Sequence, residues 1–94
     1  MTYSSITNWN TTEWNDALET LAQDKFLPMI LAAGAQRAQM VRTGDLTFSV
    51  ITEYADAKAA DPAQAKIAGI RETAAEELPM TMASAAAGVV FASS

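Results

Sequence analysis

The stretch Leu46–Tyr54, with the sequence LTFSVITEY, decides the fold predicted for this chain. One face of its alternating pattern carries Leu46, Phe48, Val50, Thr52 and Tyr54. Strict alternation with β-branched and aromatic residues indicates a half-buried strand. Turn residues occupy positions 43–45, and the extended segment Ala35–Arg42 precedes them. We therefore predict that Ala35–Arg42 and Leu46–Tyr54 pair as a β-hairpin.

The segment before the hairpin predicts one strand and one helix. Thr2–Trp9 alternates and contains Thr, Ile, Tyr and Trp, which favour extended structure. Asn10 is a preferred N-cap, so a helix is expected over Thr11–Phe26. Proline disfavours a helical conformation in the residue before it, which predicts a kink and then a short continuation, Pro28–Ala33. Gly34 is the expected C-terminal cap.

The segment after the hairpin predicts a second helix and a fourth strand. Asp56 and Asp61-Pro62 are two successive helix-start signals, and Pro62 is suited to the first helical position. The helix is expected to run to about Glu77 and to bury Ala63, Ile67, Ile70, Ala74 and Leu78. The uncharged tail predicts a strand, with Gly88 as a turn or bulge and Val89–Phe91 as a last short strand.

This order of elements, β-α-β-β-α-β, predicts the fold class. Right-handed crossovers place both helices on one face of a four-stranded antiparallel sheet. The prediction is therefore an α+β, ferredoxin-like single domain over residues 1–94. A chain of this length buries only roughly 60–65% of its unfolded surface, so a partner subunit would add to a marginal core.

Two segments carry a resemblance to a known superfamily. The first is FLPMILAAGA at residues 26–35, and the second is EELPMTM at residues 76–82, which leads into the final strand. With the order of elements, they resemble the dimeric α/β-barrel superfamily, which includes antibiotic-biosynthesis-monooxygenase-like and stress-responsive barrel proteins. The resemblance implies a homodimer in which two open sheet faces form a barrel and the carboxy-terminal strand reaches the partner.

Composition excludes several classes of function. The chain has no cysteine and no histidine, which excludes disulfides, thiol nucleophiles and Ser-His-Asp catalysis. No metal site and no cofactor are therefore expected. A net charge of −5 with six basic residues argues against a nucleic-acid partner. The first residues have neither the basic region nor the apolar run of a signal peptide, so none is expected. The apolar segment Met80–Ala92 is shorter than the about 20 residues that cross a bilayer. A soluble, cytoplasmic protein without a membrane partner is expected.

The resemblance also implies a candidate pocket. In a cofactor-independent monooxygenase of this superfamily, Asn8, Trp9, Trp14 and Tyr54 would hydrogen-bond and stack a phenolic substrate for reaction with oxygen. Haem-degrading relatives need an axial histidine, so the haem alternative is excluded here. The competing interpretation is that Asn8 serves a turn or cap and that the aromatic residues pack in the core.

Two groups of charged residues admit alternatives. Arg37, with Gln39 and Arg42, either binds an anionic ligand or belongs to a solvated strand. Glu72, Glu76 and Glu77 oppose the helix dipole. They are either exposed, or paired with an arginine of the hairpin or of a second subunit.

Two functions remain. The first is a small dimeric protein that binds a small hydrophobic molecule in a barrel or sheet–helix pocket. The alternative is a cofactor-independent monooxygenase-like enzyme that acts on an aromatic or polyketide-like substrate. No catalytic set can be assembled from the residues alone, which favours the binding protein.

Overall fold

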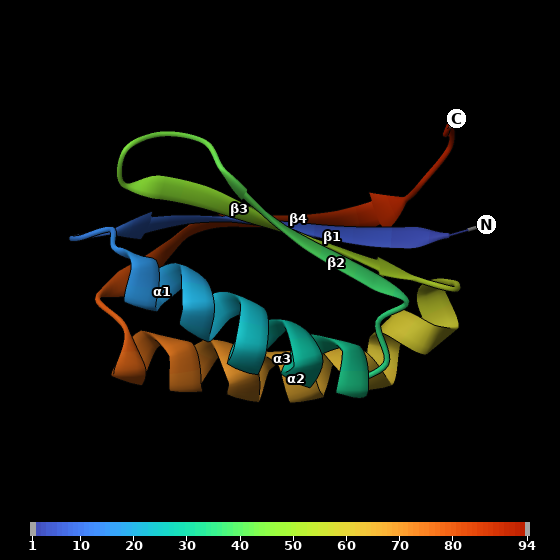
Figure 1. Cartoon of the computed structure of the whole chain (residues 1–94). Helices are drawn as coiled ribbons and strands as arrows, with labels where there is room; N and C mark the ends of the chain where they lie inside the picture. The colour runs from blue at the N-terminus through green and yellow to red at the C-terminus, as the bar shows by residue number, and fades with distance from the viewer. Residues whose placement is uncertain (1, 94) are drawn as a thin grey trace.

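The computed structural model describes residues 2–93 as a four-stranded antiparallel sheet with helices on one face (Figure 1). The elements are β1 (Tyr3–Thr11), α1 (Asp16–Leu21), the π-helical turn η1 (Ala22–Phe26), α2 (Leu27–Ala32), β2 (Arg37–Arg42), β3 (Thr47–Tyr54), α3 (Ala57–Glu77) and β4 (Met80–Val89). The strands lie in the order β2-β3-β1-β4. This arrangement confirms the predicted ferredoxin-like class.

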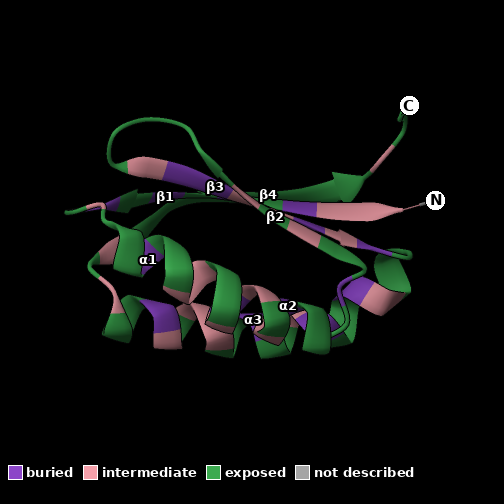
Figure 2. Ribbon diagram, viewed as in Figure 1, coloured by how far each residue is buried: buried purple, intermediate pink, exposed green. Residues whose placement is uncertain are grey.

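The central strand β1 shows why the sheet has one covered and one open face. Its alternate residues Ser5, Thr7, Trp9 and Thr11 are buried beneath the helices, and Ile6, Asn8 and Asn10 between them are exposed. Alternate side chains of a strand point to opposite faces, so the covered face forms the core. Figure 2 shows the edge strand β4 as exposed over nearly its whole length.

The hairpin of β2 and β3 is confirmed. Phe48, Thr52 and Tyr54 are buried, as their alternation predicts. Leu46, which was expected to share that face, lies instead in the turn and is exposed. β3 therefore begins at Thr47, one residue after Leu46. Thr47 lies opposite Asn10 and is the first residue of β3 in its ladder with β1.

The predicted N-cap at Asn10 is wrong. Asn10 belongs to β1 and pairs with Thr47 on one side and Thr81 on the other, so the strand continues past the predicted boundary. Asn15 is the cap, and its side-chain oxygen accepts a hydrogen bond from the Leu18 amide at 2.9 Å. Ladder pairing on both sides therefore keeps Asn10 extended.

The proline in the first helical segment is accommodated by a wide turn. Pro28 lacks an N–H group, and its ring would clash with the carbonyl of Asp24 in a regular α-helix. The π-helical turn η1 contains Asp24 and ends directly before α2. A wider turn relieves the clash, so a π-helical turn stands where the sequence predicts a kink. Gly34 then ends the helix with φ of 125°.

Two glycine substitutions test this helix end. In Gly34→Ala we expect the free energy of unfolding to fall by about 1–3 kcal/mol, because a side chain disfavours a positive φ. The added Cβ would meet only Ala63 at an ordinary 3.5 Å, so strain and not a clash is responsible. The matched change Gly69→Ala, at an open position within α3, should stabilise by about 0.5–1 kcal/mol. Urea denaturation measures the free energy of unfolding of both variants. A change of the same sign in both would contradict the assignment of backbone strain to position 34.

The second helix begins earlier than the Asp61-Pro62 signal indicates. Asp56 is the N-cap and accepts a hydrogen bond from the Ala59 amide at 2.8 Å. Pro62 therefore lies inside α3, where it removes one backbone bond near the first turn. The early start buries Ala60 against the core cluster that contains Tyr54, and this packing offsets the lost bond.

The fourth strand is continuous, which corrects the predicted turn at Gly88. Gly88 pairs with Ser4 inside β4, and no separate strand follows Val89 in the described residues, which end at position 93. The irregularity lies elsewhere, because Asn8 pairs with Ser84 and Trp9 pairs with Met82, which leaves Ala83 as an extra residue. Among the described helices, none has the length and apolar character needed to cross a membrane.

Candidate ligand cavity

A cavity of about 650 Å³ lies between the sheet and the helices. The strands β1, β2 and β3 form its floor, and α1, η1, α2 and α3 form its roof. Small side chains, including Ala22, Ala38 and Ala74, line the cavity, and larger side chains at these positions would fill the space between the sheet and the helices. The volume is within the range of about 300–1,000 Å³ that is typical of small-molecule sites.

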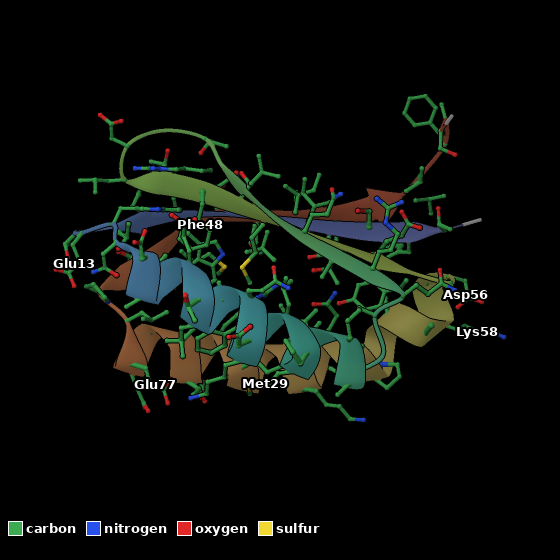
Figure 3. All side chains as sticks on the ribbon, in the orientation of Figure 1. Glu13, Met29, Phe48, Asp56, Lys58 and Glu77 are labelled. Carbon is green, nitrogen blue, oxygen red and sulfur yellow. The ribbon has the colours of Figure 1, made fainter. Side chains whose placement is uncertain are left out.

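Three aromatic residues form one wall of this cavity. The rings of Trp9 and Phe48 lie parallel, with centroids 6.2 Å apart and an angle of 6° between planes. Trp14 meets Phe48 edge-on at 5.9 Å. The Trp9 indole N–H donates to the Thr7 hydroxyl at 2.9 Å, so its polar atom is satisfied inside the protein. Figure 3 shows Phe48 on β3 facing the helices, and its position opposite Trp9 in the ladder explains the stack.

Arg42 is held beside the aromatic wall by its own hairpin. Its Nε donates to the Gly44 carbonyl at 3.1 Å, and its Nη2 donates to the Asp45 carbonyl at 2.9 Å. The guanidinium carbon lies 4.3 Å from the centroid of the Trp14 ring, a cation–π contact. The Trp14 indole N–H in turn donates to Glu19 Oε2 at 2.8 Å. These contacts connect the hairpin with α1 across one end of the cavity.

Tyr54 is the most buried side chain at the other end of β3. It is 0% exposed and belongs to a core cluster with Ile30, Ala60, Ala63 and Ile67. Its hydroxyl has no hydrogen-bond partner in the described part of the chain. Burial raises the pKa of Tyr54 above its ordinary value, and the positive charge of Arg71 partly offsets this shift.

Solved structures share this architecture. HapK from Hahella chejuensis superimposes with a TM-score of 0.74 at 15% identity, over 98% of this chain and 95% of HapK. SnoaB from Streptomyces nogalater, a cofactor-independent oxygenase, gives 0.71 at 15% identity, over 98% and 95%. A dimeric ferredoxin-like protein from an uncultured marine organism gives 0.67 at 17% identity, over 99% and 97%. The fold of this chain is ferredoxin-like.

No protein-family model and no curated protein sequence matches the chain. The likeness to these solved structures therefore confirms the expected fold. At sequence identities of 15–17%, the functional residues of these proteins cannot be assigned to positions of this chain. The roles of the cavity residues are therefore inferred from the geometry of this ferredoxin-like domain.

The residues predicted for the pocket of this ferredoxin-like domain separate into two groups. Trp9 and Trp14 line the cavity. Asn8 lies on the open face of the sheet, where it accepts from the Ser49 hydroxyl at 2.5 Å and donates to the Ser84 hydroxyl at 2.9 Å. Tyr54, in the core, and Arg37, exposed on β2, are not among the residues that line the cavity. Strand alternation separates Asn8 from Trp9, since neighbours on a strand face opposite sides.

The other charged residues differ in their surroundings. Of the polar residues on β2, Gln39 and Arg42 border the cavity. Glu77 pairs with Lys25, with 2.6 Å between Nζ and Oε2, so its partner is a lysine of η1 and not an arginine of the hairpin. Glu72 and Glu76 are exposed. Among residues 2–93, no group of three potential metal ligands comes together.

Arg71 is a cavity residue that pattern analysis missed. It lies on α3 between the cavity residues Ile67 and Ala74, four positions after the first and three before the second. These spacings place the three side chains on one helix face. A charged residue inside an apolar stripe was the available signal, because such positions normally face the core.

Proposed function

We propose that this ferredoxin-like domain binds a small aromatic, hydrophobic molecule in the cavity between the sheet and the helices. One observation carries the proposal. The space of about 650 Å³ is lined mainly by apolar side chains and has Trp9, Trp14 and Phe48 on one wall. A flat aromatic ligand would gain burial and ring contacts there, which are the main sources of affinity in such sites.

A homodimer through the open sheet face is part of the same proposal. Ile6 is 44% exposed and lies opposite Ile51 in the register of β1 and β3, so apolar side chains meet at the centre of this face. Val41 on β2 extends the exposed apolar surface. Two structurally similar proteins are described as dimeric ferredoxin-like proteins. A second copy would remove this surface from water.

The carboxy-terminal strand supports the dimer independently. β4 lies at the edge of the sheet, and residues 80–94 contain no charge and no proline. Edge strands without such residues expose unpaired backbone groups to other chains, and proteins usually cover them. Phe91 is 90% exposed just beyond this strand. Contact with a second protomer would cover both features.

A cavity-filling variant tests ligand binding. Ala74 is buried and lines the cavity, so Ala74→Phe should occupy the space and lower the affinity for 2-naphthol by more than about tenfold. Ala75→Phe adds the same ring on the exposed side of α3 and should bind as the parent does. Isothermal titration calorimetry measures the affinity. Equal binding by both variants, or a parent protein that binds no aromatic probe, would contradict the proposed site.

The second candidate is a cofactor-independent oxygenase acting on an aromatic substrate. The observation that favours it is the match to SnoaB over nearly the full length of both chains. The test is oxygen consumption with 1,8-dihydroxynaphthalene, in the parent protein and in Ala74→Phe. Oxygen uptake by the parent protein that is lost in Ala74→Phe supports the enzyme. Uptake equal to that of buffer without protein contradicts the enzyme and leaves only the binding function supported.

A further inference from the structure

A cationic side chain with no hydrogen-bond or ion-pair partner among residues 2–93 lines the proposed ligand cavity. Arg71 on α3 lines the cavity and is half-buried. Within residues 2–93 its guanidinium makes no hydrogen bond and no ion pair; the ion pair in this part of the chain joins Lys25 and Glu77. A guanidinium offers five N–H donors, so this group retains its full capacity to bind an acceptor.

The helix itself cannot neutralise Arg71. Side chains three and four positions away are its neighbours on the helix surface. At these positions the sequence has Ile67, Ala68, Ala74 and Ala75, none of which carries an acceptor. An intrahelical ion pair is therefore excluded by the spacing of the residues.

The other charged residues at the cavity already have partners. Arg42 donates to two carbonyls of its turn and lies against Trp14, and Glu19 accepts from the Trp14 indole. Two of the six basic residues line the cavity, against one of the eleven acidic residues. The cavity is thus locally positive in a chain whose net charge is −5.

This charge distribution discriminates between ligands. A neutral aromatic molecule would displace water from the Arg71 guanidinium and give no hydrogen bonds in return, which opposes binding. A carboxylate would replace that water with two parallel, charge-assisted hydrogen bonds, because the planar guanidinium matches its geometry.

We propose that the ligand of this cavity is an aromatic carboxylic acid, with its ring against Trp9, Trp14 and Phe48 and its carboxylate paired with Arg71. This assignment rests on the proposed binding function and names the chemical class of the ligand. The aromatic wall supplies burial, and Arg71 supplies the selection for negative charge.

Two isosteric probes test the assignment. 2-Naphthoate and 2-naphthamide have the same ring and nearly the same shape, but only the first carries a negative charge at pH 7. We expect the parent protein to bind 2-naphthoate at least about tenfold more tightly, as one strong charge-assisted contact would give. Isothermal titration calorimetry of both probes measures this ratio.

Substitutions at two positions of α3 then assign the preference. Arg71→Met keeps an apolar stem and should abolish the preference, so that 2-naphthoate and 2-naphthamide bind with equal affinity. Arg71→Lys, which keeps the charge without the planar fork, should lose part of the preference and serves if Arg71→Met does not fold. Lys66→Met removes an exposed positive charge from the same helix and should change neither affinity.

The outcomes separate the two proposals. Equal affinity for both probes in the parent protein, or a preference that survives in Arg71→Met, overturns the assignment of an acidic ligand and leaves aromatic binding intact. Failure of the parent protein to bind either probe, together with failure to bind 2-naphthol, overturns the cavity function as well. Loss of the preference in Lys66→Met would show a general charge effect and would also overturn the role of Arg71.

Discussion

Tyr54→Ala is expected to lower the free energy of unfolding by about 3–5 kcal/mol, the range for deleting a fully buried aromatic side chain. Tyr54 is 0% exposed and joins residues of α2 and α3 in one core cluster, so the deletion leaves a void at their junction. Small domains have total stabilities of about 5–15 kcal/mol, so much of the stability would be lost. Urea denaturation followed by circular dichroism provides the measurement.

The matched control removes an aromatic ring that is almost fully exposed in the single protomer. Phe91 is 90% exposed, so Phe91→Ala should change the free energy of unfolding of the protomer by less than about 0.5 kcal/mol. Similar losses in both variants would contradict the central position of Tyr54 in the core.

Tyr54→Phe separates the ring from its hydroxyl group. The hydroxyl is buried without a hydrogen-bond partner among residues 2–93, a situation that costs about 1–3 kcal/mol. Its removal should therefore leave stability at neutral pH unchanged or raise it by about 1 kcal/mol, within that range. Destabilisation by Tyr54→Phe would show that the hydroxyl is hydrogen-bonded in solution.

The same variant isolates a dependence on alkaline pH. Burial raises the pKa of Tyr54 in the folded state, so the unfolded chain releases the phenolic proton first as the pH rises. The stabilising contribution is complete below the unfolded pKa of about 10 and is lost as the pH rises through the folded value. Between pH 9 and 11, the parent protein should lose stability more steeply than Tyr54→Phe. Parallel curves would contradict the raised pKa.

Ile51→Asp is expected to convert the proposed dimer into monomers. Ile51 lies on the open sheet face, opposite Ile6 on one side and Gln39 on the other. A second protomer on this face would bury the new carboxylate without a partner. The second protomer carries the same substitution, so a second negative charge would lie nearby. The dissociation constant should rise by about 100-fold or more, as for a central interface residue. Sedimentation equilibrium measures it directly.

A charge on the opposite side of the domain is the control for this variant. Ala65 is exposed on α3, so Ala65→Asp adds the same charge away from the open face and should leave the association unchanged. A dimer that survives Ile51→Asp and dissociates in Ala65→Asp would place the interface on the helices. A parent protein that is monomeric at all concentrations would overturn the dimer itself.

Local patterns in the chain were sufficient for the class of fold and for several individual features. The alternation around Phe48 specified the hairpin, and the glycine at position 34 marked a helix end, as its positive φ shows. Of the predicted stripe on α3, Ala63, Ile67 and Ala74 are buried, and Ile70 and Leu78 are half-buried. This face was largely readable because the 3.6-residue period is a property of neighbouring residues. Trp9 and Trp14 could be selected as cavity candidates by residue type and by the resemblance.

Contacts between distant segments decided the rest. Asn10 extends β1 because Thr47 and Thr81 pair with it, and Asn8 turns away from the cavity because the pairing sets which face is covered. Whether Arg71 has an ion-pair partner depends on which acidic groups lie near it in the folded chain. Strand pairing and packing bring together residues that are far apart in the chain. The free energy of these contacts does not depend on any one short segment, so only the tertiary structure could determine these features.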